Sequence, residues 1–267
     1  MENTSTGRPL AVVTGASSGI GYELARQFVE HGYDVVMAAE DAELDEAATG
    51  LRRDGTATVT PVRVDLTTYD GVEQLYREIG GAGRPVAAIA LNAGVGQGGD
   101  FARQTDLRDE LAIVDLNCRS VVHLAKRVVP DMVSRGAGRV LFTSSIASTM
   151  PGAYQAVYNA SKSFTQSFAE ALREELKDTG VTVTSLMPGP TDTEFFERAD
   201  LEDTKLAKKK DDPADVARQG FEAMMKGEAK VVAGSFLNKV QAAGGRLMPD
   251  AVKAKLHGKV AEPGSGS

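Results

Sequence analysis

Tyr158 and Lys162 stand four residues apart in the segment YNASK, and this spacing places both side chains on one face of a helix. A free phenol has a pKa of about 10 and is a poor base at neutral pH, but a neighbouring ammonium stabilises the phenolate and lowers that pKa. The pair therefore predicts a site of proton transfer. Taken alone, the same spacing is common on helix surfaces, so the interpretation depends on what lies beside the pair in the fold.

Ser145 lies thirteen residues before Tyr158, at the end of the apolar segment RVLFTSS. If that segment is a strand of a parallel sheet, the Ser145 hydroxyl emerges at the carboxyl edge, where doubly wound sheets bind their ligands. A hydroxyl there can hold and polarise a carbonyl group.

A glycine-rich turn, TGASSGIG from Thr14 to Gly21, follows the first apolar segment and precedes an amphipathic helix. Glycines allow a tight turn and let the backbone approach a pyrophosphate, whose charge rests on the free N–H groups at the start of the helix. The spacing GxxxGxG differs from the GxGxxG fingerprint, so an ordinary strand-to-helix turn is the alternative. The context of strand, turn and helix favours a dinucleotide.

Glu40 lies 19 residues after Gly21, just past the second apolar segment, where an acidic residue binds the adenosine ribose in dinucleotide-binding folds. A carboxylate accepts hydrogen bonds from a 2′-hydroxyl and repels a 2′-phosphate. The glycine turn and residues 33–51 contain no Arg or Lys. This pattern favours NAD over NADP as the cofactor; the alternative is that Glu40, with Asp41 beside it, is only the first exposed residue after a strand.

The elements that position these side chains follow from the hydrophobic pattern. Near-continuous apolar runs are typical of parallel strands that are covered on both faces. Seven strands are predicted, at 10–14, 33–39, 56–64, 86–91, 139–144, 181–187 and 230–234. Helices are predicted between them, at 19–31, 42–53, 69–80, about 103–134, about 154–178 and 213–226. Strands alternating with helices predict a doubly wound α/β (Rossmann) fold with a seven-stranded parallel sheet and helices on both faces.

Composition excludes several other classes of protein. The chain has 267 residues with 42% hydrophobic and 25% charged residues, as expected for one globular α/β domain. Its net charge of −7 is the wrong sign for binding nucleic acid or anionic membranes. No run of 18 apolar residues predicts a membrane span, and His31, His123 and His257 lack the spacing of a metal site. Cys118 is the single cysteine and the N-terminus lacks a secretory signal, so a cytoplasmic protein is expected, with Cys118 a small buried apolar residue rather than a nucleophile.

These motifs together resemble those of the short-chain dehydrogenase/reductase superfamily, in its subgroup of about 250 residues. The resemblance covers about residues 10–235 and rests on five motifs in order: TGxxxGxG at 14–21, LNAG at 91–94, Ser145, YxxxK at 158–162, and Pro188-Gly189 with Thr191 and Thr193. It implies that Tyr158 is the general acid or base, that Lys162 lowers its pKa and holds the nicotinamide ribose, and that Ser145 orients the substrate. It also implies that Asn117 completes a water-mediated proton relay with Lys162.

The resemblance further implies where the cofactor lies. Asp65 and Leu66 would line the adenine pocket, Asn92 to Gly94 the ribose edge, and Thr193 the pyrophosphate or carboxamide. The cofactor residues it predicts are Gly15, Ser17, Ser18, Gly19, Ile20, Gly21, Glu40, Asp65, Leu66, Asn92, Ala93, Gly94, Tyr158, Lys162, Pro188, Gly189, Thr191 and Thr193. Relatives that use NADP tend to carry a basic residue at the position of Ser18 or of Glu40, which agrees with NAD, whereas many NAD users carry Asp at the position of Ala39.

Substrate selection is expected from the segment at about 190–212, with residues 148–155 as the opposite wall. The predicted substrate residues are Ser145, Met150, Tyr154, Phe195 and Phe196. An equal alternative for the two phenylalanines is that they pack a helix onto the core. Residues 236–260 could cap the site, pack on a partner subunit or touch a membrane surface weakly.

The resulting hypothesis is an NAD-dependent oxidoreductase that moves a hydride between the nicotinamide and a secondary alcohol or ketone. One alternative is a nucleotide-sensing regulatory protein without catalysis. Another is a sugar-nucleotide epimerase or dehydratase, for which the chain after Pro188 leaves little room. The expected organisation is an N-terminal extension at 1–9, one domain at 10–262 and a flexible tail at 263–267. A homodimer or homotetramer is expected, because both long helices carry apolar stripes on more than one face and the family pairs these helices across a two-fold axis.

Overall fold

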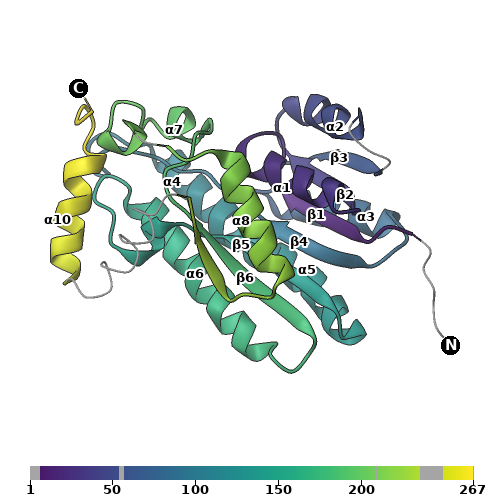
Figure 1. Ribbon diagram of the computed structural model, residues 1–267. Coiled ribbons are helices and arrows are strands. Elements are labelled where there is room, and N and C mark those ends of the chain that lie inside the picture. The colour runs from purple at the N-terminus through teal and green to yellow at the C-terminus, as the bar shows by residue number, and fades with distance from the viewer. Residues whose placement is uncertain (1–6, 54–56, 209, 235–248, 267) are drawn as a thin grey trace.

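The seven predicted strands form one parallel sheet in the order β3-β2-β1-β4-β5-β6-β7 (Figure 1). The structure is a computed structural model that describes residues 7–53, 57–208, 210–234 and 249–266. The strands are β1 (Leu10–Thr14), β2 (Asp34–Ala39), β3 (Val59–Arg63), β4 (Val86–Leu91), β5 (Gly138–Thr143), β6 (Val181–Pro188) and β7 (Lys230–Ala233). The order reverses next to β1, which pairs with both β2 and β4, so the ligand-binding crevice is expected at the carboxyl ends of β1 and β4.

Helices cover both faces of the sheet. One face carries α3 (Tyr69–Gly81), α5 (Ser120–Arg135) and α6 (Ala156–Glu175), and the other carries α1 (Gly19–Glu30), α2 (Glu43–Arg53) and α8 (Pro213–Met225). Side chains of one strand alternate between the two cores: Val12 faces the first set of helices, and Ala11 and Val13 face the second. This double burial explains why the strand sequences are continuously apolar. The predicted fold class is confirmed.

The predicted helix at about 103–134 is interrupted. It consists of α4 (Leu107–Val114), the π-helical segment η1 (Asp115–Arg119) and α5. The Asn117 side chain in η1 hydrogen-bonds to both backbone polar groups of Val95 and to Ser161, and these contacts stabilise the wide turn. A π-helical turn of this kind is common at functional sites.

Shorter elements surround the carboxyl edge of the sheet. They are η2 (Ile146–Thr149), α7 (Phe195–Arg198), η3 (Lys205–Lys208) and α10 (Asp250–Ala261). In Figure 1 the C-terminal α10 stands at the end of the molecule beyond α6. The first part of the segment at 236–260 lies outside the described residues. At the predicted flexible tail, the backbone N–H groups of Gly264 and Gly266 donate to Asp203, each at 2.7 Å. None of the helices that the structure describes is long and apolar enough to cross a membrane.

Candidate active site

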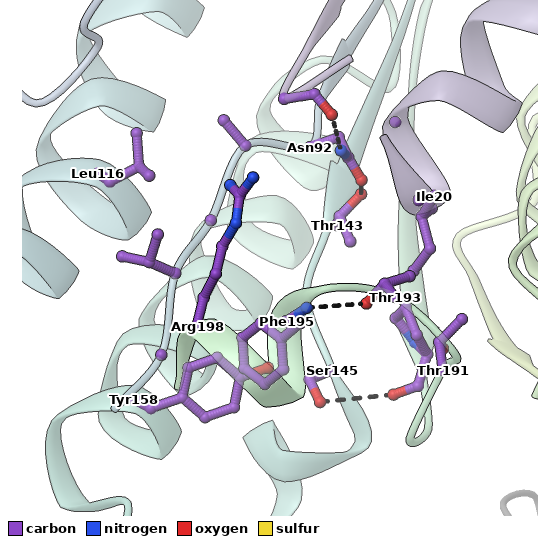
Figure 2. A pocket seen from close by; sticks show the side chains of 18 of the residues that line it. Ile20, Asn92, Leu116, Thr143, Ser145, Tyr158, Thr191, Thr193, Phe195 and Arg198 are labelled. Carbon is purple, nitrogen blue, oxygen red and sulfur yellow. Dashed lines mark hydrogen bonds between the residues drawn. The ribbon is translucent and has the colours of Figure 1, made fainter. Parts of the chain in front are cut away.

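A cavity of about 280 Å³ lies at the carboxyl edge of the sheet, at the point where the strand order reverses (Figure 2). Every residue predicted from the sequence to bind the cofactor lines this cavity, although these residues come from five strand ends and two helices. Doubly wound sheets bind nucleotides at this position. The grouping agrees with the predicted cofactor residues, whose individual roles remain predictions.

The glycine turn between β1 and α1 has the backbone that a pyrophosphate requires. Gly15 and Gly19 adopt positive φ angles of 64° and 54°. A Cβ atom on Gly21 would lie 1.8 Å from the carbonyl oxygen of Gly15, so no side chain fits there. Ser18 is the N-cap of α1, and its side chain does not cap the helix, which leaves the first N–H groups of α1 available to an anion.

The Asn92 side chain links this turn to the neighbouring strand by hydrogen bonds. Its Nδ2 donates to the carbonyl oxygens of Thr14 at 3.1 Å and Gly15 at 3.3 Å, and its Oδ1 accepts from Thr143 Oγ1 at 3.0 Å. The carboxyl ends of β1, β4 and β5 are thereby tied together. A bound dinucleotide would meet a preformed turn.

Tyr158, Ser145 and Lys162 face the same end of the cavity. Lys162 Nζ lies 5.8 Å from the centre of the Tyr158 ring and donates to the carbonyl oxygen of Thr143 at 3.0 Å. Figure 2 shows Ser145 near the phenol, and Phe195 packs against the phenol ring with 5.2 Å between ring centres. The arrangement presents a hydroxyl and a phenol to one substrate oxygen.

The electrostatics of Tyr158 differ from the expectation. The ammonium was expected to lower the phenol pKa, but burial raises the pKa of Tyr158 to about 12, and a hydrogen bond with Ser145 opposes the rise. Burial also lowers the pKa of Lys162 to about 8. At neutral pH Tyr158 is therefore a neutral phenol, which is a proton donor, beside a lysine that is still mostly charged.

Asn117 is buried behind this pair. Its Oδ1 accepts from Val95 N–H at 3.0 Å, and its Nδ2 donates to Val95 O and Ser161 Oγ, both at 2.9 Å. A Cβ atom placed on Gly94 would lie 3.0 Å from Lys162 Nζ and 3.1 Å from Asn117 Oδ1. The two polar groups therefore flank the same small space, of the kind that a bridging water occupies.

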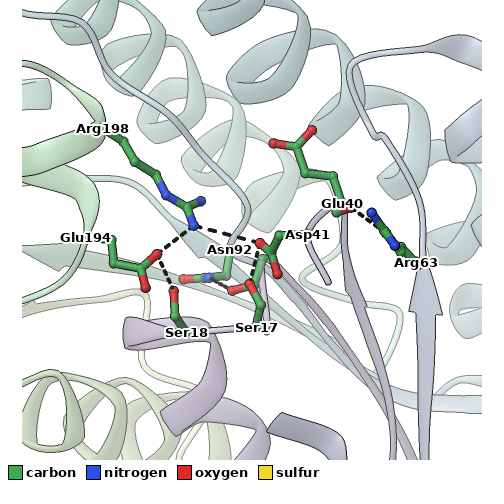
Figure 3. A network of polar contacts seen from close by, with 9 residues as sticks. Ser17, Ser18, Glu40, Asp41, Arg63, Asn92, Glu194 and Arg198 are labelled. Carbon is green, nitrogen blue, oxygen red and sulfur yellow. Dashed lines mark hydrogen bonds and ion pairs between the residues drawn. The ribbon is translucent and has the colours of Figure 1, made fainter. Parts of the chain in front are cut away.

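A polar network at the adenosine end includes residues that the sequence did not identify (Figure 3). Asp41 accepts a hydrogen bond from Ser17 Oγ at 2.8 Å, and both Asp41 and Glu40 line the cavity. Arg198 of α7 pairs with Glu194 at 2.6 Å and reaches Asp41 at 3.9 Å. Arg198 lies far from this turn in the sequence, and no local pattern indicates the contact.

A second arginine also lies near this end: Arg63, at the end of β3, donates to the backbone carbonyl of Glu40 at 3.0 Å. Arg63 and Arg198 both lie outside the glycine turn and residues 33–51. The fold brings two further cations to the area.

The substrate end contains four of the five predicted residues. Ser145, Met150, Phe195 and Phe196 line the cavity, and Phe196 also packs into a small core with Ala199 and Leu201. Tyr154, the fifth, does not line the cavity.

The reason is local backbone geometry. Tyr154 has a positive φ of 63°, and its hydroxyl contacts Glu262 at 3.5 Å. The cavity is lined instead by the next residue, Gln155, and by His257 of α10. In the sequence, Gln155 is only the last residue of the predicted substrate wall at 148–155, and His257 is only an isolated histidine.

Two further predictions concern Cys118 and a metal site. Cys118 is half-buried, and burial raises its thiol pKa, as expected for a packing residue rather than a nucleophile. No cluster of metal ligands occurs among residues 7–53, 57–208, 210–234 and 249–266.

Comparison with known proteins identifies the family. The model of the short chain dehydrogenase family matches residues 9–204, which is most of the chain and contains the glycine turn, Ser145, Tyr158 and Lys162. The chain belongs to the short-chain dehydrogenase/reductase family. It is therefore an NAD(P)-dependent oxidoreductase that acts on alcohol or carbonyl groups.

Individual relatives of this short-chain dehydrogenase agree with that assignment. Sulfoacetaldehyde reductase 2 of Chromohalobacter salexigens is 32% identical over 188 residues, covering 70% of this chain and 74% of the relative. The NADP-dependent 3-hydroxy acid dehydrogenase of Salmonella typhi is 29% identical over 180 residues, covering 67% and 71%. A short-chain dehydrogenase from Sphingobium yanoikuyae, solved in complex with NADPH, is 27% identical with a TM-score of 0.78, covering 84% of this chain and 87% of that one.

Proposed function

We propose that this short-chain dehydrogenase transfers a hydride between NAD(H) and a secondary alcohol or ketone, with Tyr158 transferring the hydroxyl proton. The single observation that carries the proposal is the position of Tyr158. It lies in one cavity with the glycine turn, Ser145 and Lys162, and its phenol is protonated at neutral pH.

In the direction of ketone reduction, a nicotinamide cofactor held by the residues of the glycine turn and by Lys162 would supply the hydride to the carbonyl carbon. Ser145 orients the carbonyl oxygen by hydrogen bonding, and the Tyr158 hydroxyl donates its proton to that oxygen as negative charge develops on it. The C=O bond becomes a C–O single bond, a C–H and an O–H bond form, and Tyr158 is left as the phenolate. The Lys162 charge stabilises that phenolate.

Reprotonation of Tyr158 requires a path to solvent. We assign this role to Lys162, Asn117 and a water held between them beside Gly94, where the two polar groups flank the same space. The two hydrogen bonds between Asn117 and Val95 hold the side chain in place for this task.

Replacing the phenol by a ring of the same shape tests the proposal. Tyr158→Phe is expected to reduce turnover of a secondary alcohol by about 10²-fold or more, while the affinity for the nicotinamide measured by calorimetric titration changes little. Tyr154→Phe, four residues away and outside the cavity, is the matched control and is expected to keep full turnover. Retained turnover in Tyr158→Phe would remove this residue from the mechanism.

The preference for NAD rests on the carboxylates of Glu40 and Asp41, which both line the adenosine end and disfavour a 2′-phosphate. Arg198 and Arg63 act in the opposite direction, and two of the relatives described above are associated with NADP or NADPH by name. Arg198 is already neutralised by Glu194 and Asp41, which leaves the carboxylates in excess.

Calorimetric titration with NADH and, separately, NADPH tests this preference. We expect tighter binding of NADH, and a shift of the affinity ratio toward NADPH in Glu40→Arg. Glu43→Arg, a nearby acidic residue at the start of α2 that does not line the cavity, controls for the general change of charge. An unchanged ratio in Glu40→Arg would eliminate Glu40 as the selecting residue.

No observation favours either alternative function. A regulatory protein without catalysis requires the glycine turn but not the complete set of Asn117, Ser145, Tyr158 and Lys162. The location in the cytoplasm and the assembly into a homodimer or homotetramer stay proposals. Exposed apolar side chains on α4 and α6 support the proposed assembly.

A further inference from the structure

The C-terminal helix α10 closes the substrate end of the cavity. Its His257 is 7% exposed and bonds to the backbone of Ala153, and its Gly258 packs closely enough that a Cβ atom would lie 3.4 Å from Ala153 Cβ. The match to the family model ends at residue 204, so this helix lies outside the part of the chain that the family defines. What α10 contributes to the cavity therefore comes from outside the matched region.

The hydrogen bond of His257 determines which of its ring nitrogens carries the proton. Nδ1 lies 3.0 Å from the carbonyl oxygen of Ala153, and a carbonyl oxygen only accepts, so Nδ1 is the donor. Burial lowers the pKa of His257, so the ring is neutral at neutral pH and Nε2 is an acceptor. Nε2 has no hydrogen-bond partner among the residues that the structure describes, and His257 lines the same cavity as Tyr158.

Gln155 presents a second polar group to this end of the cavity. It is 4% exposed, it is the N-cap residue of α6, and it precedes Tyr158 by about one helical turn. Both backbone polar groups of Gln155 have hydrogen-bond partners. Its N–H donates to the Gly152 carbonyl oxygen, and its own carbonyl oxygen accepts from the Asn159 N–H. Its side-chain carboxamide, in contrast, has no partner within the described part of the chain.

His257 and Gln155 flank one turn of backbone, residues 152–155, since His257 bonds to Ala153 and Gln155 ends the turn. Both side chains line the cavity, and the Gln155 carboxamide and His257 Nε2 have no partner within the described part of the chain, so both groups are available to a ligand that enters it. The chemical group that satisfies both is a hydroxyl, because it donates one hydrogen bond and accepts another.

The cationic side chains that line the cavity already have hydrogen-bond or ion-pair partners. Lys162 bonds to Thr143, and Arg198 is paired with Glu194 and Asp41 at the adenosine end. Among the described lining residues, no other lysine or arginine remains to neutralise a substrate carboxylate or sulfonate. An anionic group would also meet the lone pair of Nε2.

Building on the proposed function, we infer that His257 and Gln155 form a substrate subsite for a hydroxyl group, so that the enzyme acts on uncharged hydroxylated ketones and their diols. The substrate hydroxyl donates to His257 Nε2 and accepts from the Gln155 carboxamide N–H. The reacting carbonyl oxygen lies at Ser145 and Tyr158, and hydride and proton transfer proceed as above. The hydroxyl itself does not react.

Paired ketones test this inference. The kcat/KM values for acetoin and 4-hydroxy-2-butanone are compared with that for 2-butanone, which lacks the hydroxyl, and with that for acetoacetate, which carries a carboxylate. The wild-type protein is expected to prefer at least one hydroxyketone over 2-butanone by about tenfold or more, and to use acetoacetate poorly. His257→Phe and Gln155→Leu are each expected to abolish most of that preference and to keep activity on 2-butanone within about twofold. Tyr154→Phe, which alters the same turn but not the cavity, is expected to keep the preference.

The outcomes separate the two claims. Loss of activity on all four ketones to the same extent in His257→Phe and Gln155→Leu would mean that the residues are structural, and would overturn the subsite. Wild-type activity on 2-butanone without a preference for either hydroxyketone, or with a preference for acetoacetate, would overturn the subsite and leave the proposed function intact. Absence of wild-type activity on every ketone with either nicotinamide would overturn the proposed function itself, and the subsite with it.

Discussion

At the scale of single residues, burial controls the chemistry of Tyr158 and Lys162 more strongly than their mutual contact does. Both side chains are buried, and desolvation disfavours the charged form of each, which raises one pKa to about 12 and lowers the other to about 8. The protein thus holds a neutral phenol next to a lysine that titrates within a few pH units of neutrality. A proton can be given to a substrate and replaced without a large change in buried charge.

The Lys162 pKa predicts how stability depends on pH. Since the folded pKa of about 8 is below the ordinary value of 10.5, the unfolded chain binds more protons between these two values, and the free energy of unfolding rises with pH in that window. The destabilisation is fully present below pH 8 and is on the order of 3 kcal/mol.

Lys162→Met carries no charge and lacks this pH dependence. Chemical denaturation at pH 7, 8, 9 and 10 is expected to show wild type gaining stability relative to Lys162→Met as the pH rises. Lys126→Met, at an exposed lysine of α5, is the matched control and is expected to follow wild type. A constant difference between wild type and Lys162→Met across this range would contradict the lowered pKa.

At the scale of elements, α7 connects the substrate loop to the cofactor turn. Thr193, just before α7, lies so close to Gly19 that a Cβ on that glycine would be 2.7 Å from its Cγ2. Arg198 forms ion pairs with Glu194, just before α7, and with Asp41, which follows β2 (Figure 3). The guanidinium therefore lies beside the glycine turn between β1 and α1, on an element that also carries Phe195 against Tyr158.

This placement predicts that Arg198 contributes to cofactor affinity. Arg198→Met is expected to raise the dissociation constant for the nicotinamide cofactor about tenfold, because it leaves the Glu194 and Asp41 carboxylates uncompensated beside the predicted pyrophosphate position, and to do so less at high salt. Calorimetric titration at two salt concentrations measures both effects. Arg218→Met on α8 removes a similar helical arginine with two carboxylate partners outside the cavity, and its affinity should equal that of wild type. Equal affinities in all three proteins would exclude this electrostatic effect.

At the scale of the whole molecule, apolar side chains remain exposed on the face made by α4 and α6. Leu107 is 69% exposed and Leu111 is 52% exposed on α4, and Phe164 is 43% exposed on α6. The two helices pack together, so these exposed side chains lie on neighbouring elements. An apolar surface on paired helices favours a symmetric contact with a second copy of the chain.

A charge placed at this surface should prevent assembly. Sedimentation velocity is expected to show the wild type as a dimer or tetramer, and Leu111→Glu or Phe164→Glu shifted to monomer at micromolar concentration with unchanged circular dichroism. Val252→Glu alters an exposed apolar residue of α10 and is expected to keep the wild-type assembly. A monomeric wild type would refute the proposed interface.

The sequence by itself determined the architecture and the grouping of the cofactor residues. Continuous apolar runs predict buried parallel strands, and the carboxyl ends of such strands meet at one edge, so the glycine turn, Ser145 and the Tyr158 helix had to converge. These inferences depend only on residues that are near one another in the chain. The π-helical turn at Asn117 was missed because contacts with Val95 and Ser161, rather than local spacing, stabilise it.

Only the tertiary structure decided which side chains complete the site. His257 meets Ala153 across 104 residues, and Ser18 meets Glu194 across 176, and no periodicity in the sequence encodes such contacts. It also decided that Gln155 rather than Tyr154 enters the cavity, through the backbone conformation of one turn. The direction of the Tyr158 pKa shift was decided in the same way, because desolvation depends on everything packed around a group and not on its neighbour along a helix.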